Sequence, residues 1–358
     1  MDNRWFFVGV GCVAFAIFVF FMVRSSQVRK LTIYNSFSDF NRVGEAVRTQ
    51  EFIQSRLLNI NFVPGMSVKI LEVLKKVGDG QLDSAITSLY YWGKLDPCLY
   101  LISAMPFAYN EFQQINLINS ERGQQIYDQI GKRHNVVIFP CGLTGIQVCG
   151  WWRSVPKKLQ DLSGVKMRFT GMAAEIFRRL GAVPRDDIEV TQLGRALEIG
   201  DIDVAEWTTP ADDMRQGFYK YAPHAMLPGW HEPGTILHFI VNSDVWSSLT
   251  TRQQQDIKNA CEYSLIRLVA SYHLLDGQAL KELQQNGVQF HQWPLSFLRE
   301  FYRIYQNLIR EYSKKDALFN ELYSIIAAET SAFSRYQMMQ QEPLAQFING
   351  VLSATTVK

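Results

Sequence analysis

Hydrophobic and polar positions alternate with two different periods over the first two thirds of the chain. The segments 30–37 and 59–65 are short runs that predict strands, and 41–58 between them suits a helix. The segment 67–80 predicts a second helix, whose apolar face consists of Val68, Leu71, Leu74 and Val77. Strand-like and helix-like segments then alternate to about residue 245. This order predicts an α/β fold with mostly parallel sheets.

The pattern changes to helices alone near residue 250. Residues 250–285 form one long helical stretch, which the Thr250–Thr251 pair can cap. Helical segments continue over 294–340, and 344–358 is expected to be a short helix with a frayed end. The chain therefore divides into an α/β part followed by a helical C-terminus.

A short internal echo indicates two related halves within the α/β part. The stretch GQLDSAI begins at Gly80 and GDIDVAE begins at Gly200. Each follows an amphipathic helix and opens a buried strand. Two lobes with the same local architecture would produce this echo, although a glycine before a strand is also the ordinary end of a helix–strand unit.

The N-terminus carries an uncharged apolar run over 5–23. Nineteen such residues are long enough to cross a bilayer core of about 30 Å. The run is longer than the core of a signal peptide, and no A-x-A cleavage site follows it. We expect an uncleaved membrane anchor, with a processed signal peptide as the alternative. The flanking charges do not settle which side of the membrane the rest of the chain occupies.

The composition argues against several classes of protein but does not by itself indicate a function. The formal net charge is +2 and the hydrophobic fraction is 47%, which indicates a globular protein and argues against a nucleic-acid partner. Five cysteines are scattered without a CxxC pair, so a zinc framework is not expected. Cys141 and Cys149 could bond in an oxidising compartment, and small buried thiols are the favoured alternative.

Two charged residues are candidates for a binding site. In the predicted strand 201–207, Glu206 continues the apolar face of Ile202 and Val204, where a carboxylate needs a cation or hydrogen-bond donors. The alternative is that the strand ends at Ala205 and Glu206 is solvated. Arg168 ends the predicted strand of GVKMRFTG, where ligands bind in open α/β sheets and a guanidinium offers a planar fork to a carboxylate. A surface ion pair is the alternative for Arg168.

Polar and aromatic residues elsewhere suggest pocket walls. Tyr90 and Tyr91 close the strand of the first echo, and Gln147 lies within a strand that precedes two tryptophans. Each of these has a purely structural alternative. Three histidines and Glu232 fall within the fifteen residues 224–238, but their spacing matches no familiar zinc site. No phosphate-binding loop, dinucleotide fingerprint or nucleophile motif is present, which argues against an enzyme.

Three stretches together resemble the solute-binding subunits of TRAP (tripartite ATP-independent periplasmic) transporters. They are DLSGVKMRFTG, GDIDVAEWTTPADDMRQGFYKYA and PGWHEPGTILHFIVN, and they are similar to the branch that binds 2-oxo acids. The resemblance covers about 31–336. It implies two α/β lobes that close on a ligand, crossing strands and a long lobe-spanning helix. The segment 208–213 departs from the family's usual sequence, which leaves the substrate open.

The resemblance also implies a site. Arg168 would grip the substrate carboxylate, with Tyr90 and Tyr91 from the first lobe. A bridging Na⁺ or Ca²⁺ would be held by Gln147, Glu206, the carbonyl of Trp207 and Glu232, and these ions prefer oxygen ligands. The substrate contacts expected from the family are Arg168, Gln147, Tyr90, Tyr91, Trp207 and Glu206.

The resulting expectation is a binding protein on the periplasmic side of the bacterial inner membrane. It would be tethered through 5–23 or secreted after signal cleavage, and would deliver its ligand to the membrane subunits of a TRAP transporter. The expected parts are an anchor (1–29), lobe I (30–145 with 234–249), lobe II (146–233), a connecting helix and strand (250–292) and C-terminal helices (293–358). Homodimerisation through those last helices is a further expectation. The alternative is a membrane-tethered ligand-sensing module with the same fold; an anchored hydrolase has little support.

Overall fold

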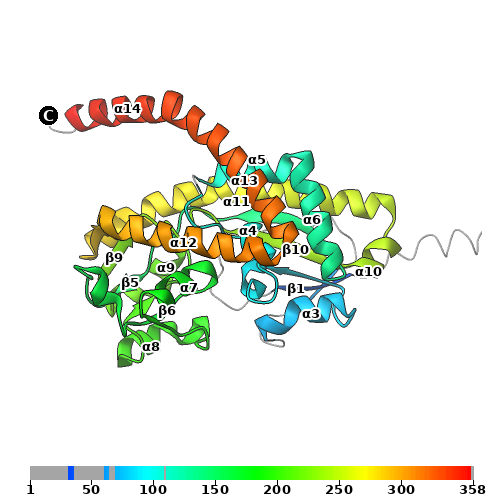
Figure 1. The fold of residues 1–358 in the computed structure, drawn as a ribbon, viewed down its shortest axis with the longest axis horizontal. Helices are drawn as coiled ribbons and strands as arrows, with labels where there is room; N and C mark the ends of the chain where they lie inside the picture. Colours follow the sequence, from blue (N-terminus) through cyan, green and yellow to red (C-terminus); the bar gives the residue numbers. More distant parts are fainter. Residues whose placement is uncertain (1–30, 36–59, 64–68, 109, 356–358) are drawn as a thin grey trace, which may run out of the picture.

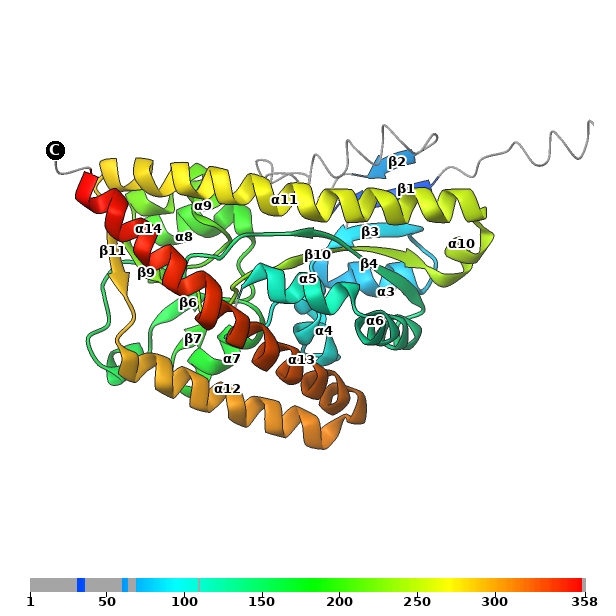
Figure 2. The same cartoon turned by 90° about the horizontal axis from the view of Figure 1, so that it is seen from above.

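The computed structural model describes residues 31–35, 60–63, 69–108 and 110–355. They form two sheets with helices packed around each, so the molecule has two lobes (Figures 1 and 2). The predicted membrane anchor over 5–23 and the predicted helix over 41–58 lie outside the described residues. Within the described part, no helix has the length and apolar character needed to span a membrane.

The first sheet has five strands in the order β2-β1-β3-β10-β4. Their bounds are Ile60–Val63 for β2, Leu31–Asn35 for β1, Ser84–Thr87 for β3, Ile236–Asn242 for β10 and Val136–Leu143 for β4. β1 pairs in parallel with β2 and β3, whereas β10 pairs antiparallel with β3 and β4. The helices of this lobe are α3 (Val73–Gly78), α4 (Cys98–Leu101), α5 (Glu111–Asn119), α6 (Glu121–Arg133) and α10 (Ser243–Ser248).

The second sheet has six short strands in the order β11-β9-β5-β8-β6-β7. Their bounds are Gln289–Gln292 for β11, His224–Leu227 for β9, Trp151–Trp152 for β5, Val204–Ala205 for β8, Lys166–Arg168 for β6 and Val183–Pro184 for β7. β6 pairs in parallel with β7 and β8, whereas β5 pairs antiparallel with β8 and β9. The helices of this lobe are α7 (Gly171–Arg179), α8 (Leu193–Ile199) and α9 (Pro210–Gln216).

The prediction of mostly parallel sheets holds only in part, because both sheets are mixed. The chain passes from the first sheet to the second after β4 and returns in β10, and these two strands pair antiparallel with each other. A strand that enters a sheet from the other lobe needs no helical crossover, so it is free to run against its neighbours. Local alternation of strands and helices does not reveal such a passage.

Long helices bind the two lobes together. α11 (Thr251–Gln285) has 35 residues, about 52 Å at the usual rise per residue, and lies along both lobes in Figure 2. Thr250 caps it through a capping box with Gln253, as predicted for the threonine pair. α12 (Leu295–Lys315) packs on α7 of the second lobe, and α13 (Ala317–Tyr336) packs on α4 and α5 of the first.

The chain ends in a helix that leaves the body of the molecule. After α13 a π-helical turn over Gln337–Gln341 leads into α14 (Glu342–Thr355). In Figure 1 this last helix extends away from both lobes. The predicted helical C-terminus is therefore present, and its final helix begins two residues before the predicted position 344.

The segment predicted as one helix over 67–80 is shorter than expected. A 3-10 turn over Ile70–Glu72 precedes α3, and the described helix ends at Gly78. Leu74 and Val77 are buried as predicted, but Leu71 is 61% exposed. The tighter turn changes the phase of the helix, which rotates Leu71 away from the core face.

The cysteines pair differently from the two alternatives considered. Cys141 in β4 forms a disulfide with Cys261 in α11, which are 120 residues apart in sequence. Cys149 and Cys98 are buried free thiols. The pairing joins a strand to a distant helix, and nothing in the spacing of the cysteines indicates it. A structural disulfide is typical of proteins in an oxidising compartment.

Candidate functional site

Arg168 and Glu206 meet at one edge of the second sheet. β6 and β8 run in parallel with Arg168 opposite Ala205, so the residues that follow the two strands lie together. Arg168 Nη1 donates to the main-chain oxygen of Glu206 at 2.9 Å, and lies 3.7 Å from its Oε2. The strand does end at Ala205, yet Glu206 is 1% exposed, so the solvated alternative is wrong. The guanidinium also lies 5.5 Å from the centre of the Trp207 ring.

Glu232 and Gln147 form the second part of the site. Gln147 Nε2 donates to Glu232 Oε2 at 2.8 Å and to the Thr235 hydroxyl at 2.9 Å, and that hydroxyl donates to the same carboxylate oxygen. The main chain of Gln147 also donates to the carbonyl of Glu232. These bonds fix one oxygen of the Glu232 carboxylate and leave the other free of them.

The first glycine of PGWHEPG, Gly229, is required for steric reasons. A Cβ at Gly229 would lie 1.9 Å from the carbonyl oxygen of Gln147, so only glycine allows the two segments to approach. This approach brings Glu232 beside Gln147. The turn therefore places the carboxylate, which explains why a charged residue lies between two Pro-Gly pairs.

Tyr90 and Tyr91 reach the same place from the first lobe. They lie in a 3-10 turn, Leu89–Trp92, directly after β3, with their rings 4.5 Å apart. Tyr91 interacts with the Arg168 guanidinium and with Tyr90. Burial raises the pKa of both phenols, and the Glu206 and Glu232 carboxylates raise it further, so both hydroxyls keep their protons at neutral pH. The two lobes thus share one buried polar site.

Several polar atoms of this site are buried without a hydrogen-bond partner among the described residues. They are the Oε1 atoms of Gln147 and Glu206, the Nε atom of Arg168 and the hydroxyl of Thr170. Burial, and then the nearby Glu206, raises the pKa of Glu232 to about 7. Two unpaired acceptor oxygens, one of them on a buried carboxylate, fit a hard cation, and the unpaired guanidinium nitrogen fits an anion.

His231 is a neighbour of the site that the sequence pattern did not single out as such. Its Nε2 lies 3.5 Å from Glu206 Oε1, and its side chain is fully buried. Burial alone lowers the pKa of His231, but neighbouring Cys149 and Glu206 outweigh burial and hold the pKa well above its usual value. The other two histidines of this stretch lie elsewhere: His224 contacts His291, and His238 lies in the first sheet near Tyr127.

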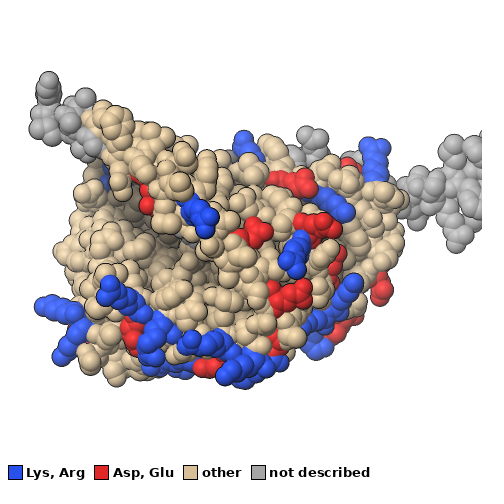
Figure 3. Space-filling view, turned by 45° about the horizontal axis from the view of Figure 1, so that its top comes forward, with Lys and Arg blue, Asp and Glu red and all other residues tan. Residues whose placement is uncertain are grey.

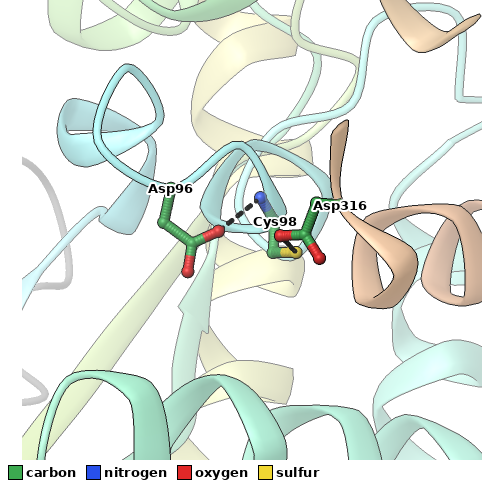
Figure 4. Close-up of side chains that lie close together, drawn as sticks. All are labelled: Asp96, Cys98 and Asp316. Atoms are coloured by element: carbon green, nitrogen blue, oxygen red, sulfur yellow. Dashed lines mark hydrogen bonds between the residues drawn. The ribbon is translucent and has the colours of Figure 1, made fainter. Parts of the chain in front are cut away.

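A second cluster of possible metal ligands consists of Asp96, Cys98 and Asp316 (Figure 4). The cation of this cluster is Arg133, whose Nη1 lies 2.6 Å from Asp316 Oδ2 and 3.4 Å from Asp96 Oδ1. Arg133 holds the pKa of Asp316 at about 2. His134 also contacts Asp96. The cluster therefore ties the end of α6 to α4 and to the start of α13, and has a structural role.

The segment 208–213 fastens α9 in place. Asp213 accepts hydrogen bonds from the main chain of Thr208 and from the Trp151 indole, and Asp212 accepts one from Tyr272 of α11. Asp276 of α11 accepts one from the main chain of Ala211. These buried contacts hold the backbone that carries Trp207. Sequence reasoning missed them because all the partners except Thr208 are distant along the chain.

Comparisons with known proteins agree with this geometry. Residues 59–316 match the family described as bacterial extracellular solute-binding protein, family 7. A monocarboxylate 2-oxoacid-binding periplasmic protein of Nostoc is 32% identical over 281 residues, which is 78% of this chain and 76% of that protein.

Solved structures of TRAP periplasmic solute-binding proteins have a similar fold. A TRAP periplasmic solute-binding protein of Colwellia psychrerythraea, with bound calcium and pyruvate, superposes with a TM-score of 0.84 at 25% identity over 89% of this chain and 99% of that one. Another, of Pseudoalteromonas atlantica with bound sodium and pyruvate, has a TM-score of 0.83 at 25% identity over the same shares.

Proposed function

Because the chain belongs to family 7 of the bacterial extracellular solute-binding proteins, we propose that it binds a small 2-oxo acid, such as pyruvate, between its lobes. It is a binding protein of the TRAP type and not an enzyme. The observation that carries the proposal is the buried Arg168 guanidinium beside two buried carboxylates, covered by tyrosines of the other lobe. We take 30–145 with 234–249 as lobe I and 146–233 as lobe II.

Arg168 would bind the ligand carboxylate through charge-assisted hydrogen bonds. Tyr91, which already interacts with the guanidinium, would add a neutral donor, with Tyr90 beside it. Gln147, Glu206 and Trp207 would form the remaining contacts. Closure of the lobes removes water from these bonds, which strengthens each of them.

A bridging cation fits the charges of the site. Arg168 and His231, whose pKa is raised, offset the charges of Glu206 and Glu232, so a bound carboxylate would leave one negative charge without a partner. Gln147, Glu206, Glu232 and the carbonyl of Trp207 would hold Na⁺ or Ca²⁺, which would offset that charge and bridge ligand to protein. Support comes from the two unpaired acceptor oxygens, and from relatives that bind pyruvate with calcium in one case and sodium in the other.

Thermal unfolding tests the ligand. Pyruvate at a hundred times its dissociation constant should add about 2.7 kcal/mol to the free energy of unfolding. Arg168→Met should abolish this gain, while Arg133→Met, which removes an arginine of the other cluster, should lower stability and keep the gain. A chain that gains no stability from pyruvate or longer 2-oxo acids, with Ca²⁺ and Na⁺ supplied, would contradict the proposal.

We also propose that the chain delivers its ligand to TRAP membrane subunits from the periplasmic side of the inner membrane. The Cys141–Cys261 disulfide supports an oxidising location. The anchor over 5–23 remains a prediction. N-terminal sequencing of the protein isolated from its own cells would distinguish an uncleaved anchor from a cleaved signal peptide. No comparison supports the ligand-sensing alternative. Uptake assays in cells with and without the gene would test delivery.

Homodimerisation through the C-terminal helices is a further proposal. α14 contains one charged residue, Glu342, and the surface leading to the grey C-terminus is correspondingly tan in Figure 3. The exposed apolar side chains of this helix are Leu344, Phe347, Ile348 and Val351. Light scattering should show a dimer that Phe347→Glu dissociates, while Leu274→Glu, at an exposed apolar site on α11, leaves it intact. A monomeric unaltered chain would refute this.

A further inference from the structure

We propose that His231 is a positioning residue, which orients the Glu206 carboxylate toward the bridging cation. This inference rests on the proposed function. His231 Nε2 lies 3.5 Å from Glu206 Oε1, and both side chains are almost completely buried. Neither atom has a hydrogen-bond partner among the described residues. Cys149 also lies beside the imidazole, but the contact between His231 and Glu206 reduces the desolvation cost of both buried polar groups.

Aromatic rings hold the imidazole in this orientation. Phe169 meets it edge to face at 5.5 Å between centroids, and Trp230 does so at 6.0 Å. Trp230 is itself stacked between Phe107 and Phe301. The rings of these two walls supply no acceptor to the imidazole, and their contacts favour the orientation in which Nε2 faces the carboxylate.

The two carboxylates of the site are then oriented by separate sets of donors. Glu232 has one oxygen fixed by Gln147 and Thr235. Glu206 has Oε2 near Arg168, at 3.7 Å, and Oε1 near His231. Without His231, Arg168 would be the one charged side chain among the described residues that holds the Glu206 carboxylate. The Arg168 guanidinium would also have to bind the ligand.

Outer partners of this kind affect metal affinity directly. A carboxylate that binds a metal is commonly held by hydrogen bonds from a second layer of residues, and loss of one such partner weakens the metal about 10- to 100-fold. His231 precedes Glu232 in the chain, so the same turn that places one carboxylate also places the donor that orients the other. In PGWHEPG, His231 would therefore orient Glu206, whereas Glu232 would contact the cation itself.

Two substitutions of similar polarity separate positioning from packing. In His231→Gln the amide nitrogen reaches about as far as Nε2, whereas in His231→Asn the side chain is one methylene shorter. Ca²⁺ and Na⁺ are each titrated calorimetrically into the cation-free full chain in potassium buffer. We expect His231→Asn to weaken the bound cation about 10- to 100-fold, and His231→Gln to stay within a few-fold of the unaltered chain.

His238→Asn is the matched control, because His238 is an equally buried histidine in β10 of the first sheet. Both Asn variants should lower the melting temperature of the cation-free protein, but only His231→Asn should lose cation affinity. Equal affinity in His231→Asn and the unaltered chain would overturn the inference, as would a folded His231→Gln as weak as His231→Asn.

Two further outcomes complete the test. Should His231→Asn not fold, a cation-bound crystal structure of His231→Gln decides the matter. In that structure the amide of the introduced Gln must donate to Glu206 Oε1. If the amide points elsewhere and the variant binds the cation as tightly as the unaltered chain, the inference is overturned. An unaltered chain that binds neither cation overturns the proposed cation site and this inference together, whereas loss of the His231 effect alone leaves the proposed function standing.

Discussion

Removal of the cation should weaken binding of the 2-oxo acid, because the ligand carboxylate adds a negative charge beside the buried carboxylates of Glu206 and Glu232. Arg168, Glu206 and Glu232 are each less than 5% exposed, so water screens them little. At an effective dielectric constant of about 20, two unit charges about 4 Å apart interact by about 4 kcal/mol. Desolvation offsets part of this, and coupling between two bound ligands is typically about 1–3 kcal/mol, or roughly 5- to 150-fold in affinity. We expect at least a tenfold effect.

Calorimetric titration of pyruvate, with and without saturating Ca²⁺ in potassium buffer, measures this coupling. Linkage requires that pyruvate strengthen Ca²⁺ binding by the same factor. Glu232→Gln should weaken Ca²⁺ and reduce the coupling, while Glu311→Gln, at an exposed glutamate of α12 that pairs with Arg179, should change neither. A pyruvate affinity that is the same in both buffers would refute the charge argument, even if pyruvate binds tightly.

Three further predictions concern closure and stability. Lys94 of the first lobe and Asp186 of the second form an exposed ion pair, so Lys94→Ala should raise the stopped-flow dissociation rate of pyruvate only a few-fold, and less at high salt. Burial raises the pKa of Asp276 to about 6, so its folded form binds a proton more tightly than the unfolded chain and stability falls as pH rises from about 4 to about 6. Asp276→Asn should therefore stabilise the protein by up to roughly 2 kcal/mol in urea unfolding above that range, and not at all below it. Reduction of Cys141–Cys261, which closes a loop of 120 residues, should lower the free energy of unfolding by about 2–5 kcal/mol in the same assay.

Part of the site was predictable because it depends on short-range pattern. Period-two alternation predicts that Glu206 continues the buried face of Val204, and Glu206 is buried although the strand ends at Ala205; the end of a strand before a glycine places Arg168 at a sheet edge. Parallel pairing of β6 with β8 then brings the two together. Which strands are neighbours is not a local property, so the meeting of Arg168 with Glu206 required either the structure or the family resemblance.

The remaining features depend on contacts between distant segments. The Cys141–Cys261 disulfide, the Asp212–Tyr272 bond and the Asp96–Arg133–Asp316 network all join residues whose sequence neighbours give no sign of the partner. The mixed sheets have the same origin, since β4 and β10 are passages between lobes. Leu71 shows a smaller failure: one 3-10 turn changes the phase of a helix and moves a residue from core to surface.

The distribution of the site over the two lobes implies an order of binding. On the proposed lobe boundaries, Arg168, Gln147, Glu206, Trp207 and Glu232 lie in the second lobe, whereas the first contributes Tyr90 and Tyr91. The second lobe would therefore carry both the guanidinium proposed to bind the anion and the oxygens proposed to bind the cation, with Thr235 of the first lobe helping to orient Glu232. We propose that ligand and cation bind there first and that the tyrosines then cover the carboxylate and exclude water. Because the tyrosines contribute neutral donors and no net charge, closure adds hydrogen bonds without altering the balance between ligand and cation.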